Sequence, residues 1–578
     1  MRRIVFCAAA VLVAVSSLPS AQQQQADKVK AASDYLGAAN MKSVRYTGFG
    51  ANYTVGQAFS PSAEWPKVEI KSWDAQVNYE TGAMQLDLVR EMGRIPPRGG
   101  GVPFVGEQRQ SQFVLGTTAW DVPVAAPAPG GRGGRAGGAA AGGRGGAAEP
   151  GRVTLQEALT FSGVRPPAPP VNPQPAAGVD RMLQVYLMPH GFLRAAAANN
   201  ATSRTVPGGT EVTFTLQGKY KFTGLINARN EVEKVSTITA NPVFGDMPIE
   251  ATFSNYQKTD ADTMFPLRVV QRTGGQVSLE LWVSSVLTNP NANSVFNDPR
   301  NNPSEVGAVD LRVPEAARNA TVPAPTVNAE KIGDGIFYLT GGTHHSVAIE
   351  MRDHVILVEA PQNEARSIAV IAKVKETIPN KPIKFVVNTH VHFDHSGGLR
   401  TLVNEGATIV TQQANRAFYQ KAWAQPHTLT PDLLSQSKKT PTFLTFLDKQ
   451  VLTDGRRTVE VLRIQNSNHN EAFAMVYVPS AKLLIEADAY TAAAAPPAPA
   501  AGQAPAAGRA GGAPAAGGAP AAPAAPAGPN PETVNLYANV QRLKLDVAQV
   551  AGLHGRLATI DELKAAATPA PPAATAGQ

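Results

Sequence analysis

Two segments of this chain consist almost entirely of Ala, Pro and Gly, and they limit how much of the chain can form a packed core. Residues 125–148 otherwise contain only three Arg, and residues 491–528 otherwise contain only Thr491, Gln503 and Arg509. Side chains this small cannot bury enough surface to offset the entropy lost when the backbone is ordered. We therefore predict disordered insertions at 125–148 and 491–528, and we extend this prediction to the Pro-rich run 166–178 and the tail 567–578.

These segments also distort the bulk composition. The chain is 43% hydrophobic but only 6% aromatic, with 51 Gly and 47 Pro among 578 residues, so much of its hydrophobic content is alanine. The net charge of +7 falls to about +1 when the arginines of the N-terminus and the insertions are set aside, namely Arg2, Arg3, Arg132, Arg135, Arg144 and Arg509. A nearly neutral remainder lacks the basic surface that nucleic-acid binding requires, so we predict no nucleic-acid partner.

The first residues have the pattern of an export signal. MRR precedes an apolar stretch from Ile4 to Val15, and the small-residue region SSLPSAQ follows. We predict a signal peptide at 1–21, cleaved near Ala21, and a periplasmic or secreted protein. The alternative is a membrane anchor, but the apolar stretch is shorter than the roughly 20 residues that span a bilayer. We therefore expect no stable transmembrane segment after cleavage.

Cysteine use narrows the possible chemistry. The only cysteine is Cys7, which lies inside the predicted signal peptide. The mature protein would then contain no thiol. Disulfides, cysteine nucleophiles and cysteine metal ligands are excluded together.

Residues 27–300 read as a β-rich antiparallel domain. The clearest unit is FPLRVVQRTGGQVSLELWVSSV, in which two alternating runs are joined by Thr273, Gly274 and Gly275, a hairpin pattern. A short helix from Asp27 to Leu36 leads into the sheet. This pattern is similar to the half-barrel of periplasmic lipoprotein carriers and related lipid-binding modules. The alternative is a β-rich scaffold that binds no ligand.

Beyond a linker at 301–324, residues 325–566 alternate between strands and helices. IFYLTG, SVAIEM and HVILVEA are consecutive strands, and EARSIAVIAKVKETI carries apolar residues at helical spacing: Ile368, Ile371, Val374 and Ile378. IKFVVNT is a short strand of the kind that is buried on both faces. Further helices are expected near 412–422 and 532–544. We predict an α/β layered domain.

Directly after IKFVVNT comes HVHFDHSGG, which places four potential metal ligands within six positions: His390, His392, Asp394 and His395. In an extended loop, residues two apart point the same way, so His390 and His392 can hold one cation. Asp394 and His395, at the turn into a following helix, can reach a second cation.

This motif resembles the H-x-H-x-D-H signature of the metallo-β-lactamase superfamily, and the resemblance covers residues 325–566. It implies a four-layer αβ/βα sandwich with metals at its edge. It also implies three later ligands, and His469 in NSNHNEAF, Asp488 in KLLIEADAY and His554 in VAGLHGRL match them in order.

Carried over residue by residue, the resemblance assigns His390, His392 and His469 to one metal and Asp394, His395 and His554 to the other. Asp488 would bridge them. Such ligands suit two Zn²⁺ ions per chain, and Fe or Mn would tolerate the same set. A water shared by two such ions ionises near neutral pH and supplies a hydroxide nucleophile for hydrolysis. Asp394 is also the predicted catalytic carboxylate.

Around the ligands the sequence departs from the family pattern. Asn468 and Asn470 flank His469 where the family usually has Gly-His-Thr, and Ala487 stands in place of a Gly before Asp488. These departures affect pocket shape more than metal binding. We predict weaker substrate contacts from His344, His345 and Tyr490, and supporting roles for Glu359 and Glu486.

The predicted function is an exported metal-dependent hydrolase that cleaves an ester, thioester, lactone or amide bond in a small molecule. One alternative is a β-lactamase, although the β-lactamases that use only His and Asp ligands generally lack the bridging Asp. Another alternative is an envelope lipid- or ligand-binding protein with an accessory metallo domain. The oligomeric state stays open.

Overall fold

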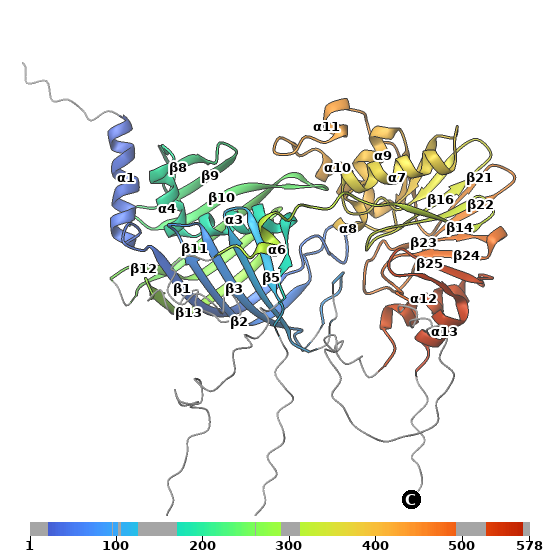
Figure 1. The fold of residues 1–578 in the computed structure, drawn as a ribbon, viewed down its shortest axis with the longest axis horizontal. Helices are drawn as coiled ribbons and strands as arrows, with labels where there is room; N and C mark the ends of the chain where they lie inside the picture. Colours follow the sequence, from blue (N-terminus) through green and yellow to red (C-terminus); the bar gives the residue numbers. More distant parts are fainter. Residues whose placement is uncertain are drawn as a thin grey trace, which may run out of the picture.

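The computed structural model describes residues 21–94, 96–101, 104, 106–124, 170–259, 262–290, 312–492 and 528–569, with side chains from residue 28 onward. All of the predicted signal peptide except Ala21, the insertion 125–148, nearly all of 491–528 and most of the tail lie outside the described residues. Figure 1 shows two folded units side by side, a β-rich N-terminal unit and a C-terminal unit of mixed strands and helices.

The N-terminal unit contains one 13-stranded antiparallel sheet, which confirms the β-rich prediction. Its order is β6-β5-β4-β3-β2-β1-β13-β12-β11-β10-β9-β8-β7. The strands are β1 (Ser43–Tyr53), β2 (Lys67–Asn78), β3 (Ala83–Glu91), β4 (Gln108–Leu115), β5 (Thr118–Val122), β6 (Asn172–Pro173), β7 (Thr202–Val206), β8 (Gly209–Leu216), β9 (Tyr220–Ile226), β10 (Val232–Asn241), β11 (Gly245–Lys258), β12 (Met264–Thr273) and β13 (Gln276–Thr288).

The predicted hairpin is present. Thr273 pairs with Gln276, and Gly274 and Gly275 between them have φ of +59° and +87°, which suits a two-residue turn. Three helices cover one face of the sheet: α1 (Ala21–Leu36), α3 (Gly178–Leu187) and α4 (Pro189–Ala198). Their buried side chains, among them Leu36, Leu183 and Phe192, join those of the strands in one hydrophobic core. The sequence analysis had not predicted α3 and α4.

Part of the predicted disordered insertion 166–178 is ordered, and the predicted linker 301–324 contains a short helix. Within 166–178, β6 pairs with β5, where Pro173 lies opposite Trp120, and the short helix η1 (Pro175–Ala177) follows. Within the linker 301–324, helix α6 (Glu315–Arg318) buries Ala317 in the same small core as Trp120. Composition did not reveal the order within 166–178, because it depends on the pairing of single residues with β5.

The C-terminal unit contains a seven-stranded sheet, β14 to β20 in order, and a six-stranded sheet, β21 to β26 in order. The first holds β14 (Asn328–Gly333), β15 (Ile336–Thr340), β16 (Ser346–Glu350), β17 (Val355–Val358), β18 (Ile383–Val387), β19 (Thr408–Gln412) and β20 (Phe443–Phe446). The second holds β21 (Lys449–Thr453), β22 (Thr458–Arg463), β23 (Ala474–Val478), β24 (Leu483–Glu486), β25 (Gln549–Gly552) and β26 (Leu557–Thr559).

The expected helices of this unit are also present. They are α7 (Glu364–Thr377), α8 (Phe393–Ser396) within the motif, α10 (Gln413–Trp423) and α12 (Pro531–Arg542). The structure adds helices that were not predicted: α9 (Leu399–Glu405), α11 (Leu433–Ser437), η2 (Pro479–Ala481) and α13 (Ile560–Ala567). In α7 the buried stripe differs from the prediction, because Ile368 is 47% exposed and Val370 is buried instead. Apolar side chains of both sheets form one core, and those of the first sheet and α7 form another.

Within the described residues, no helix has the length and apolar character needed to cross a membrane.

Candidate metal centre

The loop after β18 carries the motif, and buried hydrogen bonds fix its backbone. The amide of Asn388 donates to the carbonyl oxygen of His390 at 2.7 Å, and the hydroxyl of Tyr419 donates to Asn388 Oδ1 at 2.7 Å. Three histidines of this loop are fully buried, namely His390, His392 and His395. The remaining predicted ligands follow other strands: His469 lies between β22 and β23, Asp488 follows β24, and His554 follows β25.

The first predicted group converges. The ligand atoms of His390, His392, His469 and Asp488 lie within 4.8 Å of one another. His390 Nε2 is 2.9 Å from His392 Nδ1 and 3.2 Å from His469 Nε2. This is the set that the family resemblance assigned to one metal, together with its bridging carboxylate.

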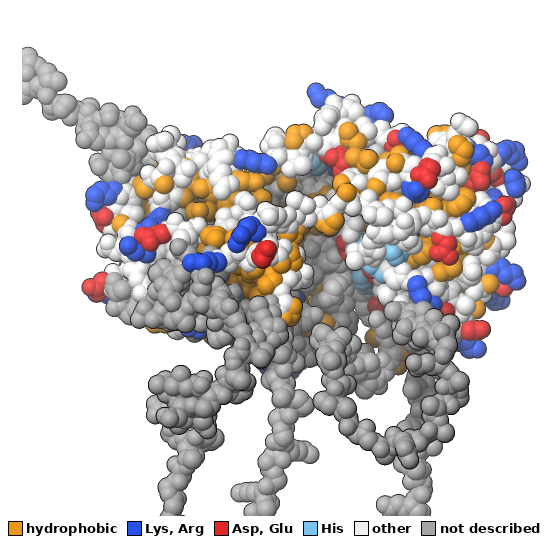
Figure 2. Space-filling view, in the orientation of Figure 1, with side chains coloured by type: hydrophobic (Ala, Val, Ile, Leu, Met, Phe, Trp, Pro, Cys, Tyr) orange, Lys and Arg blue, Asp and Glu red, His pale blue; other side chains and the backbone are white. Residues whose placement is uncertain are grey.

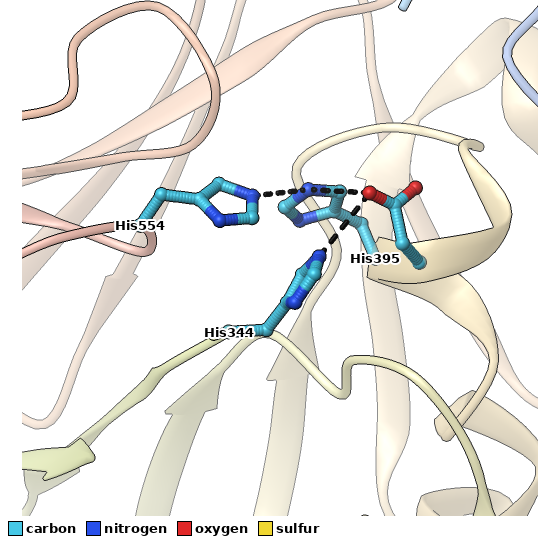
Figure 3. Close-up of side chains that lie close together, drawn as sticks. His344, His395 and His554 are labelled. Atoms are coloured by element: carbon cyan, nitrogen blue, oxygen red, sulfur yellow. Dashed lines mark hydrogen bonds and ion pairs between the residues drawn. The ribbon is translucent and has the colours of Figure 1, made fainter. Parts of the chain in front are cut away.

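The second group also converges, and it contains an unexpected member (Figure 3). Ligand atoms of Asp394, His395, His554 and His344 lie within 4.8 Å of one another. His554 Nε2 is 3.1 Å from His395 Nε2, and His344 Nε2 is 3.2 Å from Asp394 Oδ2. His344, which we expected to contact substrate, lies among the candidate ligands.

Asp488 lies between the two groups. Its Oδ2 is 2.9 Å from His469 Nε2 and 3.0 Å from His395 Nε2, and its Oδ1 is 2.8 Å from His554 Nε2. Its φ of +55° turns the side chain into the centre. The carboxylate of Glu486 stabilises this turn by accepting from the backbone N–H groups of Ala489 and Tyr490, both at 3.1 Å.

The histidine tautomers fit metal binding. A neutral imidazole carries one proton, and in these rings it lies on the nitrogen that faces an oxygen acceptor outside the two ligand groups. His554 Nδ1 is 3.0 Å from the carbonyl oxygen of Thr343, His395 Nδ1 is 3.3 Å from Glu359 Oε2, and His392 Nε2 is 2.9 Å from the carbonyl oxygen of Ala58. The other nitrogen of each ring then directs a lone pair into the centre.

His390 follows the same rule. Thr389 donates its hydroxyl hydrogen to Glu359 Oε2 at 2.5 Å, so Thr389 Oγ1 accepts from His390 Nδ1 at 2.9 Å. Lone pairs therefore face lone pairs, and the buried Asp488 Oδ2 has no hydrogen-bond partner among the residues that the structure describes. A cation resolves this clustering of acceptors. Imidazole and carboxylate donors suit Zn²⁺, Fe or Mn ions, so the residues fit the implied metals.

Electrostatics keep the ligands in their metal-binding forms. Burial, reinforced by His395, lowers the pKa of His390 to about 4, so this imidazole is neutral at neutral pH. Burial opposes ionisation of Asp488, but the charges of His395 and His469 outweigh it and hold the Asp488 pKa well below its usual range.

His395 shows the opposite shift. Burial lowers its pKa, but Asp488 outweighs burial and raises the His395 pKa well above its usual range. The His395 imidazole can therefore bind a proton where it would otherwise bind a metal ion. Nearby, burial raises the pKa of Glu486 to about 8.

A cavity of about 760 Å³ opens onto the centre, and its lining includes His344, His345, Asp394 and His554. Figure 2 shows histidine side chains on the side of the C-terminal unit that faces the N-terminal unit. His345 is anchored, because its Nε2 donates to the carbonyl oxygen of Gly555 at 2.9 Å. The third predicted substrate contact, Tyr490, is placed differently. It is buried in the core of the unit and is not among the described residues that line the cavity.

The sequence analysis missed contributions from the N-terminal unit. Gln57 donates from Nε2 to Asp394 Oδ1 at 2.8 Å, and the Ala58 carbonyl accepts from His392. Both residues lie in the loop 54–66 between β1 and β2. A single glutamine and a backbone carbonyl carry no recognisable motif, and both lie more than 300 positions before their partners.

Residues 330–535 match the family model of the metallo-β-lactamase superfamily. The C-terminal unit is therefore a metallo-β-lactamase superfamily domain, as its motif predicted. Similar solved structures include a metallo-β-lactamase from Pontibacter korlensis, 17% identical, covering 42% of this chain and 97% of that chain with a TM-score of 0.29. Another is the metallo-β-lactamase FIM-1 from Pseudomonas aeruginosa in its mono-zinc form, 18% identical, covering 42% and 95% with a TM-score of 0.29. No curated protein sequence matches the chain.

Proposed function

We propose that this protein is an exported hydrolase that uses two metal ions, with Zn²⁺ the first choice, to cleave an ester, thioester, lactone or amide bond. The observation that carries the proposal is Asp488, whose carboxylate contacts histidines of both ligand groups within 3.2 Å. When bound, two such ions supply an activated water and polarise the substrate oxygen.

The residues of the chain would then have distinct roles. His390, His392 and His469 hold one ion, and Asp394, His395 and His554 hold the other. Glu359 keeps the proton on His395 Nδ1, and Glu486 maintains the turn that aims Asp488. The two sheets that share one core, with helices on their outer faces, support the four-layer αβ/βα arrangement.

The cavity lining supports a small, neutral substrate. Beyond the residues of the two ligand groups, His344 among them, and glycines, the described lining consists of Thr54, Val55, Gln57, Thr343, His345 and Thr491. Threonine hydroxyls and a glutamine amide can orient an ester or lactone by hydrogen bonds without requiring a charge on it. The bridging position of Asp488 favours this chemistry over β-lactam hydrolysis.

The experiment begins with the metal content of the mature protein, purified aerobically without chelator. We expect two transition-metal ions per chain, and fewer than one would refute the proposal. A panel of chromogenic esters, lactones, thioesters, amides, phosphodiesters and nitrocefin, run beside an Asp394→Ala control, then identifies the bond. Turnover of nitrocefin alone would show that the β-lactamase alternative is correct.

Export is tested separately. We expect the protein recovered from outside the cytoplasm to begin near Ala21, as determined by N-terminal sequencing. An intact N-terminus on protein retained in the cytoplasm would contradict this part of the proposal.

A further inference from the structure

Two loops of the N-terminal unit reach the metal centre. The loop 54–66 joins β1 to β2, and residues 98–101 belong to the connection between β3 and β4. Backbone bonds tie both loops to the metal-binding loops. The N–H of Phe393 donates to the Gly56 carbonyl at 3.2 Å, and the N–H of Glu471 donates to the Phe59 carbonyl at 2.7 Å. In Figure 1 these connections lie beside α8, which carries Asp394 and His395.

Glycines permit this close approach. A Cβ at Gly56, where φ is +79°, would lie 2.4 Å from the ring of Phe393. A Cβ at Gly100 would lie 2.7 Å from the ring of His392. Real Cβ atoms do not come this close to other heavy atoms, so the contact requires glycine at both positions.

The first functional contact sets the tautomer of His392. This ring is fully buried, and its Nε2 lies 2.9 Å from the Ala58 carbonyl oxygen. Because that oxygen can only accept, Nε2 carries the proton and Nδ1 keeps its lone pair for the first ion. Hydrogen bonds of this kind fix the orientation and basicity of metal-binding imidazoles.

The second contact orients Asp394. Gln57 Nε2 donates to Asp394 Oδ1 at 2.8 Å, and the other oxygen, Oδ2, faces His344 and His395. The uncharged Gln57 amide restricts the rotation of the Asp394 carboxylate and leaves its negative charge in place. Gln57 also lines the cavity, so the same side chain forms part of the substrate wall.

The residues flanking His469 face the same loops. The amide of Asn470 donates to the Ala58 carbonyl at 3.1 Å, and the backbone carbonyl of Asn468 accepts from the N–H of Gly99 at 2.9 Å. Asn470 stands where the superfamily pattern has Thr. The N-terminal contact gives this departure a physical reason, since the longer amide reaches a carbonyl of the other unit.

We propose that the N-terminal β unit contributes directly to the metal centre. In this proposal Gln57 is a positioning residue for Asp394, and the Ala58 carbonyl sets the tautomer of His392. This proposal rests on the proposed function, because it concerns ions that the same site would hold. It assigns the β unit a role at the catalytic site in place of carrying an apolar ligand.

The test uses the full mature chain and the Gln57→Met variant, which keeps the side-chain volume and removes the amide. Co²⁺ is titrated into the apo protein and followed by its visible absorption. We expect the affinity for one of the two ions to fall roughly 10- to 100-fold, with a changed absorption band, while the other ion binds as in wild type. Gln271→Ala is the matched control, because Gln271 is also half-buried but its amide contacts only Ser278 within the sheet.

The outcomes separate the two proposals. If the wild-type chain binds fewer than one Co²⁺, the proposed function fails and the role of the β unit fails with it. If wild type binds two ions and Gln57→Met matches it in affinity and spectrum, only the role of Gln57 is overturned. Should the methionine variant fail to fold, Gln57→Ala, which adds no bulk, replaces it under the same criteria.

A second readout addresses His392. In ¹⁵N-labelled wild-type protein we expect a slowly exchanging histidine Nε2–H resonance, which disappears on His392→Gln substitution. Assignment of a protonated Nδ1 to His392 in the metal-loaded protein would overturn the role of the Ala58 carbonyl.

Discussion

His344 Nε2 lies 3.2 Å from Asp394 Oδ2, although His344 follows β15 and Asp394 follows β18 in the first sheet. His344 belongs to the loop between β15 and β16, and its Nδ1 is 2.9 Å from Thr343 Oγ1. When Nδ1 donates to that hydroxyl, Nε2 presents a lone pair to the second ion. The position suits a metal ligand as well as a substrate contact.

We predict that His344→Ala weakens binding of the second ion about tenfold and leaves the first ion unaffected, because one nitrogen donor is lost from the second group only. Stepwise Co²⁺ titration measures both affinities. Unchanged titration together with a raised KM would instead support the substrate contact predicted from sequence.

Asp488→Asn should reduce the metal content to one ion per chain or fewer. The amide keeps the size of the side chain but loses the charge that faces both histidine groups. Elemental analysis of the purified variant measures the effect. Asp546→Asn is the control, since Asp546 is exposed and its carboxylate pairs with Lys482, far from either histidine group, while Tyr477 contacts only its backbone carbonyl. Two ions bound to the Asp488 variant would exclude a bridging role.

The stability of the N-terminal unit should fall in acid because of His190. This ring is fully buried against Phe265, and burial lowers its pKa to about 4. An unfolded histidine has a pKa near 6.5, so below that value the unfolded chain binds the extra proton. The stabilisation is complete above pH 6.5 and is lost as the pH falls towards 4. The loss at pH 4 is about 3 kcal/mol.

Urea unfolding of the wild type and of His190→Gln at pH 7 and pH 4.5 checks this effect. The glutamine amide can still donate to the Leu36 carbonyl, which lies 3.2 Å from His190 Nε2. We expect the variant to lose less stability between the two pH values. An equal loss in both proteins would rule out His190 as the cause.

Gly56→Ala should destabilise the protein more than Gly106→Ala. Both glycines have positive φ, +79° and +72°, so both substitutions carry similar backbone strain. Only at Gly56 would the new methyl group meet a neighbour, the ring of Phe393, whereas nothing lies within 4 Å at Gly106. We expect an extra loss of about 1–3 kcal/mol in chemical unfolding. Equal losses of stability in the two variants would show that the loop 54–66 moves to accommodate the methyl group at no measurable cost.

Much of the C-terminal domain could be predicted from sequence because its signals are local. IKFVVNT is a largely apolar run with the length of a strand, and HVHFDHSGG follows it directly. Locating the strand therefore also locates the ligands at its end. The family resemblance implied three later ligands, and His469, Asp488 and His554 match them in order. The buried face of α7 was only partly predicted. Ile368 and Val370 are both apolar, and only the packing of the helix decides that Val370 is buried and Ile368 exposed.

The contacts between the units could not be predicted in this way. Gln57 acts through one amide hydrogen bond, and Ala58 acts through a carbonyl that every residue possesses. Their importance depends on a sheet that brings residues 54–66 beside a loop more than 300 positions later. The proximity of His344 to Asp394 could not be predicted for a similar reason, because the conformation of the loop between β15 and β16 decides where the ring points.

The Ala58 carbonyl also limits how the C-terminal unit can be separated from the N-terminal unit. A fragment that begins at residue 325 would retain all seven predicted ligands. It would nevertheless leave His392 Nε2, the Asn470 amide and the N–H groups of Phe393 and Glu471 without the acceptors they have in the full chain. A fragment that keeps these hydrogen bonds would therefore have to include residues 54–66.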